Sequence, residues 1–342
     1  MEKIRVSVVM CTCNGERFIR EQLDSIMAQT CPAEEIIIQD DASDDRTFDI
    51  VEEYARRYPQ IRPVRNTRRK GVNGNFFDAL SKATGDYIAI ADQDDIWEPY
   101  KIERQVQTIG DRLLCASFSR PFYGDATDDT FFDMRVPNCS LLRMIYVGVF
   151  PGHSTLFSRR LLALMPDPSP LARYRCYDMI LALTAAAFDS IVFLPEVLSW
   201  HRRHTAAYTY IRPTSNSRSA GNIFRWMQRT RRLHREVRDG IDQRLLAAKE
   251  FLSHVDSAMP VLRQALHMID LYTSHSRIDF LRLQFFCMKN YPLLLYSFSG
   301  RRSLAGYLRG FYFPVSCSDY FRFLAPAAPS FRKPEEKTVP SE

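Results

Sequence analysis

The sequence predicts an α/β protein with a mostly parallel central sheet, helices on both faces of that sheet, and a helical extension at its C-terminal end. Three observations carry this prediction. Apolar runs with strand character alternate with amphipathic helical segments over the first hundred residues. Polar and acidic turns follow these strands, and the composition changes after about residue 216 to Arg-rich and then Leu- and Phe-rich segments. Alternating strands and helices favour a parallel sheet that is covered on both faces.

The individual elements follow from the spacing of apolar residues. The run Val-Ser-Val-Val-Met at 6–10 is typical of a buried strand, and apolar side chains recur at helical spacing in 16–28. By the same criteria, strands are expected at 35–39, 86–91 and 191–194, and helices at 46–58, 75–83 and 179–188. Residues 111–145 mix short strands with polar loops, and the chain contains no internal repeat.

Composition and charge are those of an ordinary globular protein. Of the 342 residues, 46% are hydrophobic and 25% are charged, so the chain can bury a sizeable core. The net charge of +6 is too small to indicate a nucleic-acid partner by itself. No apolar stretch is as long as a transmembrane helix, and the first residues lack the apolar core of a signal peptide. Eight cysteines without a C-x-x-C pair indicate reduced, cytosolic thiols.

An acidic turn, Asp92-Gln93-Asp94-Asp95, directly follows the strand expected at 86–91. Carboxylates held this close repel one another, so a bound cation is a natural way to relieve the repulsion. Clustered carboxylates suit hard divalent ions such as Mg²⁺, which is commonly shared with substrate phosphates. The alternative is a polar turn that caps the next helix, since Asp is a favoured N-cap residue.

Two further polar turns follow the first and second strands. Thr12 and Asn14 come after the first, and Asp40 and Asp41 come after the second. Ligands of open α/β sheets bind beyond the carboxyl ends of the strands, where a nucleotide base or ribose could meet these side chains. Each turn alone is equally compatible with a helix N-terminus, but three such turns on one sheet edge favour a ligand site.

Six segments carry distinctive polar or glycine-containing patterns in a fixed order: 7–15, 39–45, 91–97, 152–157, 177–183 and 201–204. In order and spacing they resemble glycosyltransferase family 2, over roughly residues 4–207. The resemblance implies the GT-A fold and inverting transfer of a sugar. The most similar subgroup is the rhamnosyltransferase-type enzymes that build bacterial cell-surface polysaccharide. Three positions depart from the family pattern, namely Cys13, Tyr177 and Arg203.

The resemblance also implies roles for individual residues. Asp178 matches the general base, although the same residue could simply cap the helix that follows it. The implied metal ligands for Mg²⁺ or Mn²⁺ are Asp92, Asp94 and His204, and the alternative for His204 is a loop histidine without a ligand. The implied donor-binding residues are Thr12, Asn14, Asp40, Asp41, Asn75, Asp92 and Arg202. For His153 the sequence favours a supporting or packing role.

The implied organisation is a GT-A catalytic domain over 1–215, followed by a basic, helical extension over 216–325 and a disordered tail over 326–342. Within the catalytic domain, residues 1–100 would bind the nucleotide-sugar and residues 101–215 the acceptor. The expected donor is a UDP- or dTDP-sugar, and the expected acceptor is a hydroxyl of a glycan or lipid-linked glycan.

The basic extension leaves one alternative open. We expect a cytoplasmic enzyme, and the arginines of 218–238 would allow peripheral contact with the anionic inner face of the membrane. No nucleic-acid partner is expected. The alternative is a non-enzymatic protein that binds phosphate or nucleic acid through 218–238, which would leave the acidic turns unexplained.

Overall fold

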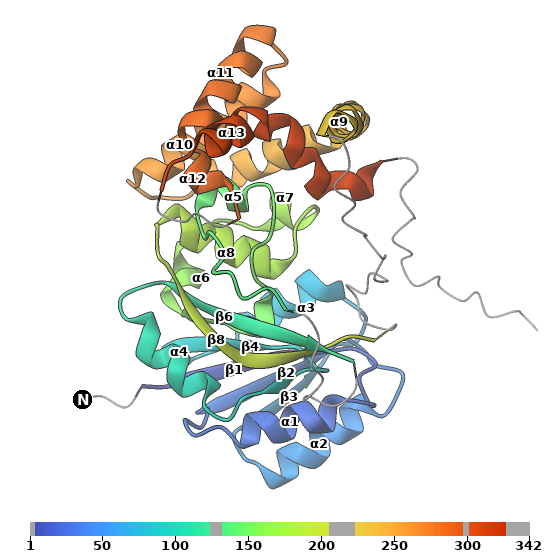
Figure 1. Ribbon diagram of the computed structural model, residues 1–342. Coiled ribbons are helices and arrows are strands. Elements are labelled where there is room, and N and C mark those ends of the chain that lie inside the picture. The colour runs from blue at the N-terminus through green and yellow to red at the C-terminus, as the bar shows by residue number, and fades with distance from the viewer. Residues whose placement is uncertain (1–3, 124–131, 205–222, 297–300, 326–342) are drawn as a thin grey trace, which may run out of the picture.

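The computed structural model describes residues 4–123, 132–204, 223–296 and 301–325. The tail for which the sequence predicts disorder, 326–342, lies outside the described residues, as does the first part of the basic stretch. The expected α/β fold class is confirmed: a mixed sheet covered by helices is followed by a set of further helices (Figure 1).

The central sheet has the described strands in the order β3-β2-β1-β4-β7-β6-β8-β5. β1 pairs in parallel with β2 and β4, β2 with β3, and β6 with β8, whereas β7 and β5 pair antiparallel with their neighbours. The parallel half therefore comes from the first hundred residues, as expected. The strands are β1 (Val6–Thr12), β2 (Glu35–Asp40), β3 (Ile61–Arg65), β4 (Tyr87–Ala91), β5 (Ile96–Trp97), β6 (Leu114–Phe122), β7 (Thr155–Ser158) and β8 (Ile191–Arg202).

Helices cover both faces of the sheet, and alternate residues of the strands point to opposite layers. Val8 and Met10 of β1 pack with α1 (Ile19–Met27), α2 (Thr47–Arg57) and α4 (Lys101–Ile109). Val9 points the other way, into the layer formed with α3 (Gly71–Leu80), α6 (Arg160–Leu164) and α8 (Tyr177–Ala187). This double burial explains why β1 and β2 are almost continuously apolar in the sequence.

Two element boundaries differ from the sequence prediction. β8 does not end at residue 194 but continues to Arg202, because residues 199–200 pair with β5 and residues 199–202 with β6. α3 begins at Gly71 rather than at residue 75, because the backbone N–H groups of Lys70 and Gly71 donate to the Asp41 carboxylate. Both causes are tertiary contacts, which local propensity does not register.

The C-terminal helices share their core with the sheet half of the chain. One apolar cluster contains Ile145 and Leu183 together with Ile241, Met268 and Phe313. In Figure 1, α5, α7 and α8 lie between the sheet and the last helices. The remaining elements are α5 (Leu141–Met144), η1 (Gly152–Ser154), α7 (Ser169–Ala172), α9 (Ile223–Ser253), α10 (Pro260–Thr273), α11 (Arg277–Lys289), α12 (Tyr291–Leu294), α13 (Leu304–Ser316) and η2 (Cys317–Leu324).

None of the helices in the described part of the chain combines the length and the apolar character needed to cross a membrane.

Candidate functional site

The carboxyl ends of β1, β2 and β4 meet at one edge of the sheet, because these strands run parallel and in register. Thr12 faces Asp40 across the β1–β2 pair, and its hydroxyl donates to the Asp40 carboxylate at 2.9 Å. Asp92 follows the last residue of β4. The three polar turns that the sequence singled out therefore do converge on one edge.

Asp40 and Asp41 are buried and are occupied by hydrogen bonds within the chain. Asp40 accepts from the hydroxyl and the backbone N–H of Ser43 as well as from Thr12. Asp41 Oδ1 accepts from Lys70 N at 2.7 Å and from Asn66 Nδ2 at 2.8 Å, and its Oδ2 accepts from Gly71 N at 2.9 Å. Both carboxylates thus fix the loops around the edge of the sheet, whatever else they bind.

Asn14 and Asn75 also connect neighbouring segments. Asn14 adopts a left-handed conformation with φ 52°, and its Oδ1 accepts from Asp44 N. Asn75 is buried on α3, where its Nδ2 donates to the Gln39 carbonyl and its Oδ1 accepts from Asn66. These contacts hold the loop after β1 and the start of α3 next to the end of β2.

Gln93, which the sequence analysis did not place in the site, fastens the loop after β1. Its Oε1 accepts from Cys13 N at 2.8 Å, and its Nε2 donates to Cys13 O at 3.0 Å. A Cβ atom added at Gly15 would lie 2.3 Å from Gln93 Oε1, so no larger residue fits there without movement. Gln93 lies between Asp92 and Asp94 in the acidic turn, and this position in the sequence could have indicated that it belongs to the site.

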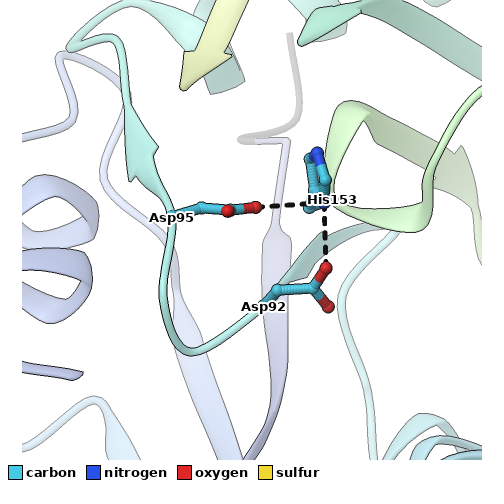
Figure 2. Close-up of side chains that lie close together, drawn as sticks. All are labelled: Asp92, Asp95 and His153. Atoms are coloured by element: carbon cyan, nitrogen blue, oxygen red, sulfur yellow. Dashed lines mark hydrogen bonds and ion pairs between the residues drawn. The ribbon is translucent and has the colours of Figure 1, made fainter. Parts of the chain in front are cut away.

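Among the described residues, Asp92, Asp95 and His153 form a group of metal-binding side-chain types whose candidate ligand atoms lie within 4.8 Å of one another (Figure 2). His153 comes from η1, and its Nδ1 lies 2.9 Å from Asp92 Oδ2 and 3.0 Å from Asp95 Oδ2. Its Nε2 lies 2.7 Å from the hydroxyl of Ser119. His153 thus holds the acidic turn, a role that the sequence only suggested.

The charges in this group compensate one another. Burial alone would lower the pKa of His153, but the adjacent Asp95 and Asp92 carboxylates raise it to about 10. Burial would likewise raise the pKa of Asp95, but the charge of His153 brings it below its usual value. The group is therefore an imidazolium held between two carboxylates.

Asp94 points to a different partner. Its Oδ2 lies 2.8 Å from His204 Nε2, which follows the end of β8. Burial, and then the negative charges of Asp95 and Asp92, raise the pKa of Asp94 to about 6. Arg202 lies alongside: its Nε donates to the Asp94 carbonyl at 3.0 Å, and its guanidinium pairs with Glu21. The extension of β8 beyond residue 194 is what brings Arg202 and His204 here.

The three carboxylates of the acidic turn differ in solvent exposure, and this difference limits what each can bind. The side chain of Asp92 is 39% exposed and that of Asp94 is 17% exposed. The side chain of Asp95 is fully buried and accepts from Arg202 N. An ion shared with an incoming diphosphate could reach Asp92 and Asp94, whereas Asp95 is confined to positioning His153 and the end of β8.

Asp178 lies in the first turn of α8, close to the acidic turn. Its Oδ2 accepts from Gly152 N at 3.1 Å, and its Oδ1 accepts from Met179 N at 2.8 Å. Burial raises its pKa to about 6, and the charge of Asp92 adds to that shift. Cys176, not Asp178, occupies the N-cap position of α8, so the N-cap position that the sequence allowed for Asp178 is wrong, although its carboxylate does accept from a first-turn N–H group.

Residues 7–164 match the family Glycosyl transferase family 2, and this stretch contains both the acidic turn and η1. By this match, residues 7–164, a little less than half of the chain, form a glycosyltransferase family 2 domain. An uncharacterized protein of Mycobacterium tuberculosis is 34% identical over 230 residues, which is 63% of this chain and 65% of that protein. The match thus spans less than two thirds of that relative's length. A dTDP-rhamnosyl transferase of Shigella flexneri is 38% identical over 105 residues, covering 29% of this chain and 36% of that one.

The crystal structure of S. aureus TarS 1–349 superposes on this chain with a TM-score of 0.54. The alignment covers 94% of this chain and 90% of TarS 1–349 at 17% identity, which shows a common fold. TarS 1–349 has also been solved with UDP and with UDP-GlcNAc. The GT-A fold that the sequence predicts is thereby confirmed.

The structure brings most of the sequence-predicted residues to one edge of the sheet, including Arg202 and His204, which lie beyond the matched stretch 7–164. Asp92 and Asp94 share a turn but bond different histidines, His153 and His204. The implied metal set of Asp92, Asp94 and His204 is therefore not the group with the closest ligand atoms, which contains Asp95 and His153 instead. Gln93, Asp95 and His153 join the site through long-range contacts, so nothing in their neighbouring sequence assigns those partners.

Proposed function

We propose that this chain transfers a sugar from a nucleotide-diphosphate donor to a hydroxyl acceptor by single displacement with inversion. One observation carries the proposal: the short η1 turn links a buried carboxylate to the acidic turn. Gly152 donates its N–H to Asp178, and the next residue, His153, lies between Asp92 and Asp95. A candidate base and the carboxylates suited to a diphosphate site are thus held by adjacent residues.

Asp178 is our candidate for the general base. Its raised pKa, about 6, is close to the value at which a carboxylate is ionised in neutral solution yet accepts a proton readily. The acceptor hydroxyl would give its proton to Asp178 as its oxygen attacks the anomeric carbon. The bond from that carbon to the diphosphate breaks at the same time, and the donor leaves as a nucleoside diphosphate.

The donor proposal is a UDP- or dTDP-sugar, bound along the edge formed by β1, β2 and β4. The named relatives and neighbours support both nucleotides, because one is a dTDP-rhamnosyl transferase and another binds UDP-GlcNAc. Thr12, Asn14, Asp40, Asp41, Asn75, Asp92 and Arg202 remain our proposed donor-binding residues. The contacts of Asp40 and Asp41 within the chain favour a rigid base pocket, because their carboxylates cannot turn without losing those bonds.

Mg²⁺ or Mn²⁺ is the proposed cofactor, held by Asp92, Asp94 and His204. The residues fit a hard cation because the side chains of Asp92 and Asp94 are both partly exposed, and because burial and the neighbouring carboxylates raise the pKa of Asp94, which a bound cation would offset. When bound, the ion would neutralise charge on the departing diphosphate as a Lewis acid. Asp95 and His153 would keep the acidic turn in place around it.

For the acceptor, we propose a glycan or lipid-linked glycan of bacterial surface polysaccharide, with the enzyme in the cytoplasm and in peripheral contact with the anionic membrane face. Exposed apolar residues on the last helices support that contact: Ile278 is 66% exposed on α11, and Leu304 is 77% exposed on α13. Arginines at 277, 301 and 302 lie next to them in the sequence. Apolar residues flanked by arginines are typical of surfaces that meet anionic lipids.

The test is thermal unfolding of the wild type with a panel of nucleotide-sugars, each with and without Mg²⁺ or Mn²⁺. A ligand that binds only the folded state raises the melting temperature by mass action. We expect a metal-dependent increase with one UDP- or dTDP-sugar that is lost in Asp94→Asn. The exposed carboxylate of Asp167 supplies the control, Asp167→Asn, which should respond like the wild type. If no nucleotide-sugar shifts the wild type, the proposed function is wrong.

A further inference from the structure

A surface pocket of about 530 Å³ lies among the C-terminal helices, away from the edge of the sheet that carries the candidate site. One wall is α9, where Arg231, His234, Arg235 and Arg238 recur at a spacing that places them on one side of the helix. The start of α11 forms the opposite wall. Among the described residues that line the pocket, none is acidic.

The positive charge of this pocket is only partly balanced within the chain. Arg238 lies 3.9 Å from Asp242, and His275 lies 3.2 Å from the same carboxylate. Arg235 and Arg277 are exposed, and neither forms an ion pair with any residue that the structure describes. Arg235 and Arg277 line the same pocket as Arg238, so an anion bound there would be attracted by all three guanidinium groups.

The start of α11 adds hydrogen-bond donors to the same pocket. Ser276 is its N-cap, and its hydroxyl accepts from Asp279 N, which leaves the N–H groups of Arg277 and Ile278 without a partner inside the helix. The Asp279 carboxylate in this first turn is paired with Arg282. His275, with φ 57°, makes the turn that leads into this helix. The positive end of the helix dipole thus adds to the arginine charge, an arrangement that favours phosphate.

His234 gives an independent sign that a ligand belongs here. Its side chain lines the pocket, yet the residue is only 8% exposed and its Nε2 has no hydrogen-bond partner. Nδ1 lies 2.9 Å from the Ser318 hydroxyl, which can donate to it and so leave Nε2 as an N–H donor. A buried donor without an acceptor is costly. The Nε2 atom itself is closed to solvent, so an anionic oxygen in the pocket satisfies it once the ring turns toward the pocket.

We propose that this pocket binds the phosphate group of a phosphate ester, between the arginines of α9 and the N-terminus of α11. Guanidinium groups and helix N-termini both match phosphate oxygens. Phe280 and Val315 provide apolar lining beside the charges, so the pocket accommodates an organic substituent as well as the phosphate. The ester is either a soluble phosphate compound or the headgroup of an anionic phospholipid. The proposal is independent of glycosyl transfer.

The experiment compares arginines that line the pocket with matched arginines on the same helices. Arg235→Gln and Arg277→Gln each remove one pocket charge. Arg232→Gln and Arg282→Gln remove the same charge from α9 and α11, at side chains paired with Glu236 and Asp279. Binding of inorganic phosphate and of glycerol phosphate to the full chain is measured by calorimetry. Binding to vesicles is measured by co-sedimentation, with equimolar phosphatidylglycerol and phosphatidylcholine compared with phosphatidylcholine alone.

We expect each pocket variant to weaken binding about tenfold or more, since a charged hydrogen bond is lost, and each control to weaken it less than about threefold. Saturable binding of the soluble phosphates with this pattern identifies a soluble ester. The same pattern with phosphatidylglycerol vesicles only identifies a lipid headgroup. Equal losses in both pairs of variants, or no binding of either kind, would overturn the proposal. So would binding of a single-stranded oligonucleotide alone.

Two checks keep the outcome interpretable. All four variants alter exposed arginines, so their melting temperatures should stay near that of the wild type. His234→Phe removes the buried donor while keeping an aromatic ring against Phe280, and it should also weaken phosphate binding. UDP-sugar binding should be unchanged in every variant, which separates this pocket from the candidate catalytic site.

Discussion

Asp178 is held in a position that stabilises its protonated form. The carboxyl is buried near the negative charge of Asp92, and the two backbone donors, Gly152 N and Met179 N, only partly offset that environment. Its pKa is therefore about 6 rather than its ordinary 3.8. A base of this kind is ionised at neutral pH, and its ionisation lowers the free energy of unfolding. The pH dependence of activity and that of stability measure these two effects.

The first prediction concerns activity as a function of pH. Below about pH 6 Asp178 is protonated and cannot accept the hydroxyl proton, so kcat/KM should rise with pH through about 6 and then level off. Asp178→Asn should lower kcat by about 10²–10⁴-fold. Donor binding should survive in that variant, which calorimetry with the nucleotide-sugar would check. An unchanged kcat would remove Asp178 from the role of base.

The second prediction concerns stability. The folded-state pKa of Asp178 is above its ordinary value, so ionisation of this carboxyl opposes folding. The contribution of Asp178 to the free energy of unfolding therefore falls as the pH rises from about 4 through 6. The difference in unfolding free energy between Asp178→Asn and the wild type should therefore be about 1–3 kcal/mol more favourable to the variant at pH 8 than at pH 4. Urea denaturation at the two pH values measures the difference. If this difference instead favours the wild type more at pH 8 than at pH 4, the raised pKa of Asp178 is contradicted.

At the scale of elements, the site depends on how three loops are fastened to the sheet. Gln93 binds both backbone groups of Cys13, Asp41 caps α3, and His153 in η1 holds the acidic turn. β8 delivers Arg202 and His204 only because it continues past residue 194 along β6. Each fastening joins segments that are far apart in the chain.

The third prediction tests the Gln93 contact. Gln93→Ala removes two hydrogen bonds that hold the loop after β1, so we expect the Kd for the donor to rise about tenfold. Gln93→Glu keeps the acceptor for Cys13 N but loses the donor to Cys13 O. Its Kd for the donor should lie between those of the wild type and Gln93→Ala. Gln107→Ala, on the exposed side of α4, is the matched control. Equal donor affinity in Gln93→Ala and wild type would show that this loop needs no such support.

At the scale of the whole molecule, the C-terminal helices and the α5–α8 region form one apolar core. Ile241 of α9 and Leu183 of α8 belong to the same buried cluster, and both are almost completely inaccessible. Helices that share a core lose stability together when a side chain of that core is removed. The extension over 216–325, predicted as a separate region, is therefore in apolar contact with the preceding part of the chain.

The fourth prediction follows from this shared core. Ile241→Ala leaves a cavity and should lower the free energy of unfolding by about 2–5 kcal/mol. Hydrogen exchange, measured by mass spectrometry, should then accelerate in 177–187 as well as in α9. Ile278→Ala, at an exposed position of α11, is the control and should change stability by less than about 0.5 kcal/mol. Unaltered protection of 177–187 in Ile241→Ala would show that the two parts unfold separately.

The sequence by itself determined the fold class, because strands buried on both faces must be apolar along their length and their helices must carry an apolar stripe. It also identified the polar turns after β1, β2 and β4, since parallel strands bring their carboxyl ends to one edge. Only the tertiary structure decided which partners these side chains have. His153, Gln93 and the end of β8 reach the site through contacts across many tens of residues, and hydrophobic periodicity carries no information about such contacts.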